Sequence, residues 1–298
     1  MEDFKLKVFY SVAKNKSFTK AAAELFITQP AVTKQIKNLE ESLETRLFDR
    51  IGNSIVMTEE AKLLFQYTNE IFHLYQEFML ELSIMKDRPA GSFTLGASTT
   101  IAQYLLSPVL SAFQTKFPEI KLNLISGNSE TIEQAVLAKD IGLGIVEGKK
   151  HHANLKYADL TTDELLLVTH SKSRYAKQSV IELNDLKNIP MVLRERGSGT
   201  LEVIDSALQD RGIRLSELPV IMHLGGTESI KSFLENSHST AFISMRAVRK
   251  ELQYGELKII QVKDLQIVRN FSFIYLYGQP DKFSTMFMRY TKQYYKEK

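Results

Sequence analysis

Residues 17–40 constrain the fold of this chain most, because they have the pattern of two short helices joined by a tight turn. Ser17 and Thr28 are residues that cap helix starts, and Pro30 falls in the first turn of the second helix, where a missing N–H costs little. At about 100° per residue, Val32 and Ile36 lie on an apolar arc opposite an arc of polar side chains. The pattern predicts a helix-turn-helix whose second helix offers a polar face to a partner.

The polar side chains of this segment suit DNA. Gln29 can read an adenine edge, Thr33 can bond a base or touch a thymine methyl, and Lys34 can reach guanine or phosphate. Residues at the start of the first helix can bond phosphates. An ordinary surface helical hairpin is the alternative reading of the spacing alone. The candidate DNA-binding residues are Ser17, Thr19, Lys20, Thr28, Gln29, Pro30, Thr33, Lys34, Lys37 and Arg50.

Residues 50–57 close the module, and Gly52-Asn53 predicts a hairpin turn between two short apolar arms. Arg50 at the base can contact phosphate or enter the minor groove, or it can pair with Glu44 or Asp49. Residues 1–58 hold nine Lys or Arg and seven Asp or Glu, a surplus of only two. We therefore expect DNA binding through a few good contacts and through dimerisation rather than through bulk charge.

Residues 58–85 predict one helix about 42 Å long, because apolar residues recur at three- and four-residue steps without Gly or Pro. A stripe this continuous needs a partner, and a second copy of the chain is the simplest one. A buried core helix of a single domain is the alternative. Residues 87–91, Asp-Arg-Pro-Ala-Gly, then break the helix and predict a hinge.

The rest of the chain alternates strand and helix patterns, which predicts an α/β domain with mainly parallel sheets. The candidate strands are residues 93–97, 121–126, 142–145, 164–169, 191–194, 221–224, 240–244 and 272–277.

Three stretches, residues 96–103, 194–201 and 225–230, each lead from a strand into a helix. Ligands of open α/β sheets bind beyond the strand ends and against helix N-termini. Hydroxyl-bearing residues and glycines in these stretches favour an anion, although each stretch alone can be a simple turn or helix cap. Together they predict a cleft for a small effector that carries a carboxylate, sulfate or phosphate group.

Composition excludes several other classes of protein. The chain has no cysteine, which excludes disulfides, thiol catalysis and cysteine zinc sites. Its histidines lack metal-ligand spacing, so no metal or other cofactor is expected. Glu195 and Glu228 can be imagined as an acid–base pair, but nothing in the sequence places a nucleophile with them. The first residues lack an apolar secretion segment and no run reaches about 20 apolar residues, so we expect a cytoplasmic protein with no membrane partner.

The N-terminal motifs resemble those of the LysR-type transcriptional regulators, namely Ser-Phe-Thr-Lys-Ala-Ala, Ile-Thr-Gln-Pro-Ala-Val-Thr-Lys-Gln-Ile and Arg46-Leu-Phe-Asp-Arg50. Thr58-Glu-Glu-Ala61 is similar to the family's Leu-Thr-Glu-Ala-Gly, with Lys62 in place of the glycine. The resemblance covers the whole chain. It implies an α+β multidomain protein: a winged helix-turn-helix (1–58), a linker helix for dimerisation (59–86), the hinge (87–91) and a periplasmic-binding-protein-like effector domain (92–298).

In that domain the family carries two subdomains joined by two chain crossings. Subdomain I would be about 92–161 with 269–298, and subdomain II about 162–268. The implied partners are promoter DNA with an inverted repeat, a small anionic effector, RNA polymerase, and further copies of the chain in a homodimer through the linker helix or a homotetramer.

The C-terminal motifs Gly-Ala-Ser-Thr-Thr-Ile and Arg-Glu-x-Gly-Ser-Gly-Thr resemble the branch that includes regulators of sulfur and cysteine metabolism. The effector contacts that this resemblance implies are Ser98, Thr99, Thr100, Gln103, Glu147, Arg194, Ser198, Thr200, Thr227 and Glu228. The leading hypothesis is thus a bacterial regulator whose effector shifts it between two states. A solute-binding protein and an enzyme acting on an anionic metabolite are the alternatives, each with an accessory N-terminal helical domain.

Overall fold

The computed structural model describes residues 3–51, 54–86, 89–148, 152–278 and 280–296. The chain divides into two compact units, Met1–Met85 and Lys86–Lys298. Each unit has its own buried apolar core.

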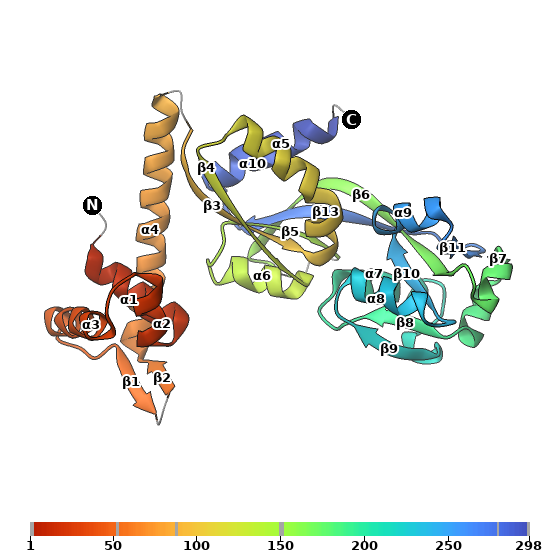
Figure 1. Ribbon diagram of the computed structural model, residues 1–298, viewed down its shortest axis with the longest axis horizontal. Helices are drawn as coiled ribbons and strands as arrows, with labels where there is room; N and C mark the ends of the chain where they lie inside the picture. Colours follow the sequence, from red (N-terminus) through yellow and green to blue (C-terminus); the bar gives the residue numbers. More distant parts are fainter. Residues whose placement is uncertain (1–2, 52–53, 87–88, 149–151, 279, 297–298) are drawn as a thin grey trace. The chain divides into compact units, whose positions relative to one another are not determined.

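The first unit is a small helical domain with a two-stranded hairpin and a long helix (Figure 1). Val8 and Phe9 of the first helix pack with Val32 and Ile36 of the third, and all four are buried. The elements are α1 (Phe4–Asn15), α2 (Phe18–Glu24), α3 (Gln29–Leu43), β1 (Phe48–Ile51), β2 (Ser54–Met57) and α4 (Glu59–Met85).

Both predicted helix caps are confirmed. The Ser17 hydroxyl accepts a hydrogen bond from the Lys20 N–H at 3.2 Å at the start of α2, and the Thr28 hydroxyl accepts one from the Ala31 N–H at 3.4 Å at the start of α3. Pro30 lies in the first turn of α3. The sequence pattern therefore fixes where both helices of the predicted helix-turn-helix begin.

The hairpin β1–β2 is antiparallel, and its register runs from Phe48 opposite Met57 to Ile51 opposite Ser54. The predicted turn at Gly52 and Asn53 lies outside the described residues. Arg50 has its backbone in β1, but its side chain also lies outside the described part of the structure.

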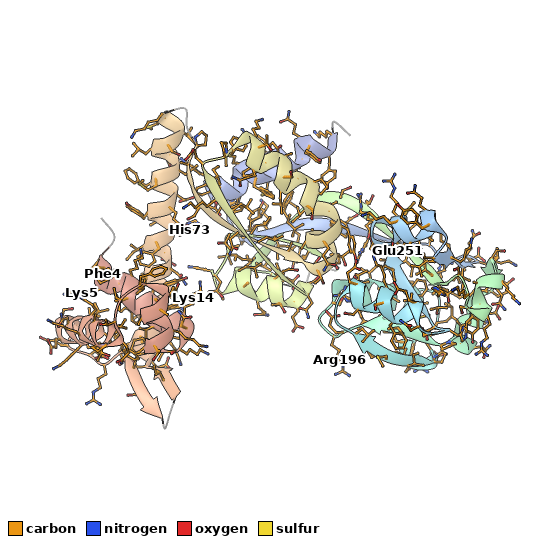
Figure 2. All side chains as sticks on the ribbon, viewed as in Figure 1. Phe4, Lys5, Lys14, His73, Arg196 and Glu251 are labelled. Carbon is orange, nitrogen blue, oxygen red and sulfur yellow. The ribbon has the colours of Figure 1, made fainter. Side chains whose placement is uncertain are left out.

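Helix α4 is 27 residues long, and the Thr58 hydroxyl caps it by accepting a hydrogen bond from the Ala61 N–H at 3.1 Å. Side chains project along its whole length (Figure 2). Many of the large apolar ones are exposed: Leu63, Tyr67, Ile71, Leu74, Phe78, Met79, Ile84 and Met85. In the described part of the chain, no helix is both long enough and apolar enough to cross a membrane.

The second unit is an α/β domain whose main sheet has the strand order β4-β3-β5-β13-β6-β10-β8-β9, with β11 also paired to β6 (Figure 1). Its strands are β3 (Gly91–Ser98), β4 (Ile120–Gly127), β5 (Leu143–Glu147), β6 (Leu155–His170), β7 (Val180–Ile181), β8 (Met191–Arg194), β9 (Val220–Leu224), β10 (Thr240–Ser244), β11 (Leu257–Ile259), β12 (Gln261–Val262) and β13 (Ile267–Leu276). Its helices are η1 (Ile101–Leu106), α5 (Ser107–Lys116), α6 (Ser129–Leu137), η2 (Arg174–Lys177), η3 (Leu183–Asn188), α7 (Gly199–Gln209), η4 (Leu215–Glu217), α8 (Thr227–Glu235), α9 (Met245–Tyr254) and α10 (Lys282–Lys296).

The expectation of mainly parallel sheets is only half right. The outer strands β3, β4, β5 and β8, β9, β10 pair in parallel, but the two central strands β6 and β13 are antiparallel to each other and to β5 and β10. These two strands are also longer than the sequence predicts. Asp159, Asp163 and Arg269 interrupt the apolar pattern inside them, so only their apolar ends are recognisable as strands.

Strands β6 and β13 connect two lobes, which we call subdomains I and II (Figure 1). Val136 and Ile274 belong to a core in subdomain I, whereas Leu167 and Leu193 belong to one in subdomain II. The predicted chain crossings therefore fall inside continuous strands, and the C-terminal ends of β3, β5 and β8 face the region between the lobes.

Helix α5 is preceded by the π-helical turn η1, which the sequence does not predict. Pro108 has no N–H to donate to the carbonyl of Tyr104. Side-chain hydroxyls bond two neighbouring carbonyls: Ser107 donates to the Gln103 carbonyl at 3.3 Å, and Tyr295 donates to the Leu105 carbonyl at 2.6 Å. Single π turns are frequent at functional sites, and this one follows directly after Ser98, Thr99 and Thr100.

Candidate functional site

The N-terminal end of α3 carries the candidate DNA-reading side chains on its exposed face. Gln29, Pro30 and Lys34 are exposed, whereas Val32 is buried against the core. The Gln29 amide donates to the Thr33 hydroxyl at 3.0 Å, and that hydroxyl donates to the Gln29 carbonyl at 3.1 Å. The two side chains are thus held together on one face, one turn apart, before any partner is present.

The other candidates of the first unit lie around this face. Ser17, Thr19 and Lys20 lie at the start of α2, and the last two are exposed. Lys37 forms an exposed ion pair with Glu41 at 3.7 Å, and its side chain remains accessible to a phosphate. The arrangement therefore presents hydroxyls, an amide and ammonium groups to one partner.

In the second unit, Arg194 and Thr99 join the two sides of the predicted cleft. Arg194 ends β8 and is 2% exposed, and its Nη2 donates to the Thr99 hydroxyl, which follows β3, at 3.0 Å. Arg194 also forms two hydrogen bonds to Glu195 at 2.7 and 2.9 Å. Burial opposes the charge on Glu195, but the hydrogen bonds and attraction from Arg194 outweigh it and lower the pKa of this carboxyl.

Two polar atoms beside this contact have no hydrogen-bond partner among the described residues. They are Nη1 of Arg194 and the hydroxyl of Ser198, and both are buried. Ser198 precedes α7, and its hydroxyl does not cap that helix. Because buried donors are nearly always satisfied, a guanidinium N–H and a hydroxyl left over at an uncapped helix N-terminus favour an anion.

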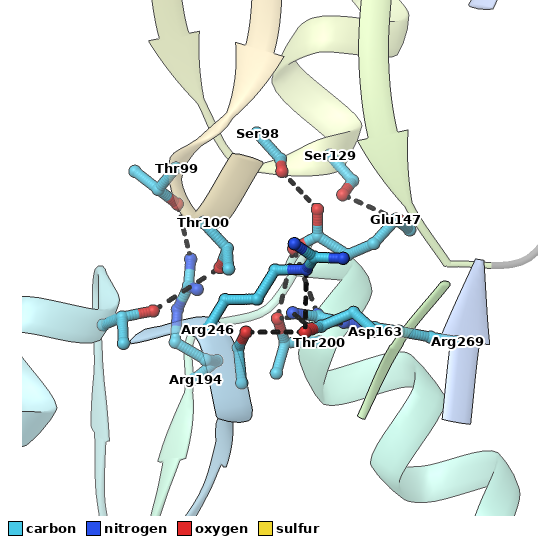
Figure 3. A network of polar contacts seen from close by, with 12 residues as sticks. Ser98, Thr99, Thr100, Ser129, Glu147, Asp163, Arg194, Thr200, Arg246 and Arg269 are labelled. Atoms are coloured by element: carbon cyan, nitrogen blue, oxygen red, sulfur yellow. Dashed lines mark hydrogen bonds and ion pairs between the residues drawn. The ribbon is translucent and has the colours of Figure 1, made fainter. Parts of the chain in front are cut away.

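The remaining candidate hydroxyls lie in two further contacts. The Thr100 and Thr227 hydroxyls are 3.5 Å apart across the cleft. The Ser98 and Thr200 hydroxyls both donate to the Glu147 carboxylate, Thr200 at 3.1 Å. Figure 3 shows Ser98 of β3, Glu147 of β5 and Thr200 of α7 converging on one another. The first two predicted stretches therefore do face each other, in direct contact between the two subdomains.

Gln103 and Glu228 lie apart from this cluster. Gln103 is exposed on η1, and no hydrogen bond of its side chain reaches another candidate among the described residues. Glu228 accepts from the Tyr104 hydroxyl and forms an ion pair with Lys231 at 2.9 Å. Lys231 is also paired with Glu251 at 2.6 Å. These four side chains tie η1 of subdomain I to α8 and α9 of subdomain II.

This second contact across the cleft affects the pKa values of its members. Burial, followed by the carboxylate of Glu228, raises the pKa of Tyr104, so its hydroxyl remains a donor. Burial alone would raise the pKa of Glu228, but hydrogen bonds from Tyr104 and Lys231 outweigh it and lower that pKa. Tyr104, Lys231 and Glu251 are not candidates from sequence, because a Tyr or a charged residue on an amphipathic helix gives no distinct signal.

Sequence reasoning also missed the charges beneath the cleft. Asp163 and Arg269 are paired directly across β6 and β13, and both are buried. Arg269 donates to Asp163 at 2.9 and 2.8 Å and to the Thr200 hydroxyl at 2.7 Å. The available signal was charged residues that interrupt two strand patterns at the predicted crossings.

The cleft is closed in this structure. The Glu130 N–H of subdomain I donates to the Gly197 carbonyl of subdomain II at 3.1 Å, and the Asn128 amide donates to the Arg196 carbonyl at 3.4 Å. Gly199 packs so tightly that a Cβ there would lie 1.9 Å from the Glu147 carbonyl oxygen. Three cavities of about 390, 540 and 580 Å³ lie elsewhere in the second unit, and Arg194 and Ser198 line none of these three.

Comparison with known proteins matches a separate family model to each of the two units. A family model described as "Bacterial regulatory helix-turn-helix protein, lysR family" matches residues 4–62, and one described as "LysR substrate binding domain" matches residues 86–294. The HTH-type transcriptional regulator CysL of Bacillus subtilis (strain 168) is 30% identical over 270 residues, which cover 91% of this chain and 89% of CysL.

Solved structures share the fold. Full-length CbnR complexed with its target DNA has a TM-score of 0.69 at 18% identity, over 98% of this chain and 99% of CbnR. The regulatory domain of CcmR from Synechocystis PCC6803, in complex with 2-PG, has a TM-score of 0.62 at 23% identity, over 68% of this chain and 96% of that one. Since one family model covers the first unit and another most of the second, this chain belongs to the LysR family of DNA-binding transcriptional regulators and has an effector-binding domain.

Proposed function

We propose that a small anion, held between subdomains I and II, controls DNA binding by this regulator. The observation that carries the proposal is the pair of buried polar atoms without a partner among the described residues, Nη1 of Arg194 and the Ser198 hydroxyl. An oxyanion accepts from both groups and from the free N–H groups at the start of α7. The Arg194 guanidinium carries the positive charge at this point and shares it with the Glu195 carboxylate.

The other candidate effector contacts fall into groups according to their hydrogen-bond partners. Thr99 orients Arg194, and Thr100 with Thr227 offers hydroxyls to the rest of the ligand. Ser98, Thr200 and Glu147 bond one another, so they shape the wall of the site. Gln103 and Glu228 are exposed and lie apart from these contacts. CcmR was solved with 2-PG, which makes that compound one member of the ligand class to test here.

A thermal-shift screen of the full chain tests the proposal. The set is sulfate, thiosulfate, phosphate, 2-PG, O-acetylserine and small carboxylates. An effector that binds only the folded form must raise the melting temperature with a saturable dose response. If none of these anions changes the melting temperature, the proposal is wrong. If only neutral analogues raise the melting temperature, the ligand is not an anion.

For the DNA side, we propose that Gln29, Thr33 and Lys34 read base edges in the major groove. Ser17, Thr19, Lys20 and Lys37 would bond phosphates, while Thr28 and Pro30 hold the start of α3 in place. The exposed polar face of α3 supports this assignment. Arg50 is proposed as a contact at the edge of the hairpin.

We further propose that α4 pairs with α4 of a second copy. Its exposed apolar side chains support this, because few soluble proteins leave such a row in water. Two linked DNA modules would then read the half-sites of an inverted repeat, and a homotetramer and a contact with RNA polymerase extend the proposal. Analytical ultracentrifugation of Leu74→Glu tests the first step: the variant should sediment as a smaller species than the wild type.

A further inference from the structure

We propose that Arg269 determines the charge specificity of the effector cleft, because it cancels the negative charge of Glu147 in the cleft wall. Neither its sequence motif nor its position in a strand marks Arg269 as a ligand contact. The inference rests on the proposed function, that the cleft takes an anion, and it explains how a site with a buried carboxylate in its wall can do so.

Arg269 is fixed by the two central strands. It lies in β13 directly opposite Asp163 of β6, and its Nε and Nη2 donate to the Asp163 carboxylate at 2.9 and 2.8 Å. The side chains of both residues are 1% exposed. The Arg269 Cζ also lies 5.0 Å from the ring centre of Phe271, so an aromatic ring packs against the guanidinium.

The remaining nitrogen of this guanidinium reaches the cleft wall. Its Nη1 is 3.4 Å from Oε1 of Glu147 and donates to the Thr200 hydroxyl at 2.7 Å (Figure 3). The Glu147 side chain is also only 1% exposed. Arg269 therefore bonds a residue of each subdomain, Glu147 at the end of β5 and Thr200 at the start of α7.

The Glu147 carboxylate is bonded by residues that neighbour, in the chain, the groups proposed to hold the anion. The hydroxyls that bond its carboxylate belong to Ser98, next to Thr99, and to Thr200, two residues after Ser198. An uncompensated carboxylate here would repel an anion strongly, since charges interact through a medium of low dielectric constant.

The charges in this cluster cancel. Two carboxylates, Glu147 and Asp163, face the guanidinium of Arg269 and that of Arg246, which lies 3.7 Å from Asp163. Removal of Arg269 leaves Asp163 with Arg246 and with the Ser244 hydroxyl, which donates to it at 2.9 Å. Among the described contacts, Glu147 then keeps the Ser98 and Thr200 hydroxyls and has no partner of opposite charge.

Three variants of the full chain separate charge from shape. Arg269→Gln removes the charge and keeps a donor; Arg269→Lys keeps the charge and loses the forked geometry. The double variant Arg269→Gln with Glu147→Gln removes one charge of each sign. Isothermal titration with inorganic phosphate and with sulfate measures binding, and the melting temperature without ligand reports whether each variant is folded.

We expect Arg269→Gln to weaken binding of the anion by on the order of tenfold or more, Arg269→Lys to retain most of it, and the double variant to regain it. Wild-type affinity in Arg269→Gln would overturn the assignment. A double variant as weak as the single one, at an equal melting temperature, would also overturn it, because Arg269 would then act by shape. If neither anion binds the wild-type chain, the same titrations use the anion that the thermal-shift screen selects; if no anion of that set binds, the proposed anion site itself fails, and this assignment fails with it.

Discussion

The two units of this regulator carry their candidate sites in opposite ways. In the first, the candidate DNA-reading side chains lie within two neighbouring helices, and most of them are exposed. In the second, the candidate contacts come from segments about one hundred residues apart, such as Thr99 and Arg194, and are largely buried. The difference suits a first unit that must contact a large DNA duplex and a second unit that must enclose a small molecule.

The contrast extends to electrostatics. The charges on α3 are exposed, as in the Lys37–Glu41 pair, and such pairs contribute little. The charges beneath the cleft are buried and depend on one another, so the loss of one partner there leaves an uncompensated charge. We therefore expect substitutions in the cleft to have larger effects than those on the reading helix.

The largest expected effect is that of Arg194→Ala. It removes the charge that faces the proposed anion, and we expect affinity for that anion to fall by on the order of 100-fold. Isothermal titration of the full chain measures it. Arg196→Ala is the matched control, because the side chain of Arg196 is exposed and points outward (Figure 2). Equal losses in the two variants would show that bulk charge, not the cleft, attracts the anion.

Gly199→Ala should come next. The added Cβ would meet the Glu147 carbonyl oxygen at 1.9 Å, so the closed form should lose about 1–3 kcal/mol. We expect a lower melting temperature and a weaker response to the anion. Gly225→Ala is the control, since no atom lies within 4 Å of a Cβ at that position. Unchanged anion binding in Gly199→Ala would contradict the closed form as the binding form.

Thr33→Ala tests the other side of the comparison. The hydroxyl bonds only its own helix turn, so the fold should be unaffected, while specific DNA binding should fall by on the order of tenfold and non-specific binding far less. Ser42→Ala, at the far end of α3, should bind DNA like the wild type. Fluorescence anisotropy with specific and scrambled duplexes gives both affinities.

The smallest effect should be a pH dependence from Glu228. Its lowered pKa means that its stabilising contacts are fully present above the ordinary Glu pKa of about 4.3 and are lost as the pH falls through the lowered value. Since this side chain is 57% exposed, the change will be small. Between pH 7 and pH 3, the melting temperature should fall slightly less steeply for Glu228→Gln than for the wild type. A steeper fall of the melting temperature in the variant would contradict the expected stabilising effect of the Glu228 carboxylate.

Local patterns predicted the first unit well. Ser17, Thr28 and Pro30 mark both helix starts, and the arc of Val32 and Ile36 marks the buried face. In the second unit, short apolar strands such as β8 and β10 were predicted at their exact bounds. The position of each of these elements is determined by the residues of one short segment of the chain.

Non-local features could not be predicted in the same way. Asp163 lies inside β6 and Arg269 inside β13. A buried charge is unexpected in a strand, so the sequence predicts a break at each residue; in the fold the two charges neutralise each other across the paired strands. The contact of Tyr104 with Glu228 depends on the π turn and on a residue 124 positions away. Such pairs have no period in the sequence, and only the fold brings them together.

The most direct test of the account is a footprint of the full chain on DNA upstream of its own gene, with and without the anion selected by the thermal-shift screen. For the wild type, we predict that the anion changes the spacing of protected half-sites or the affinity for them, while Arg194→Ala binds the same DNA and shows no change. A footprint in which Arg194→Ala responds to the anion like the wild type would contradict the account.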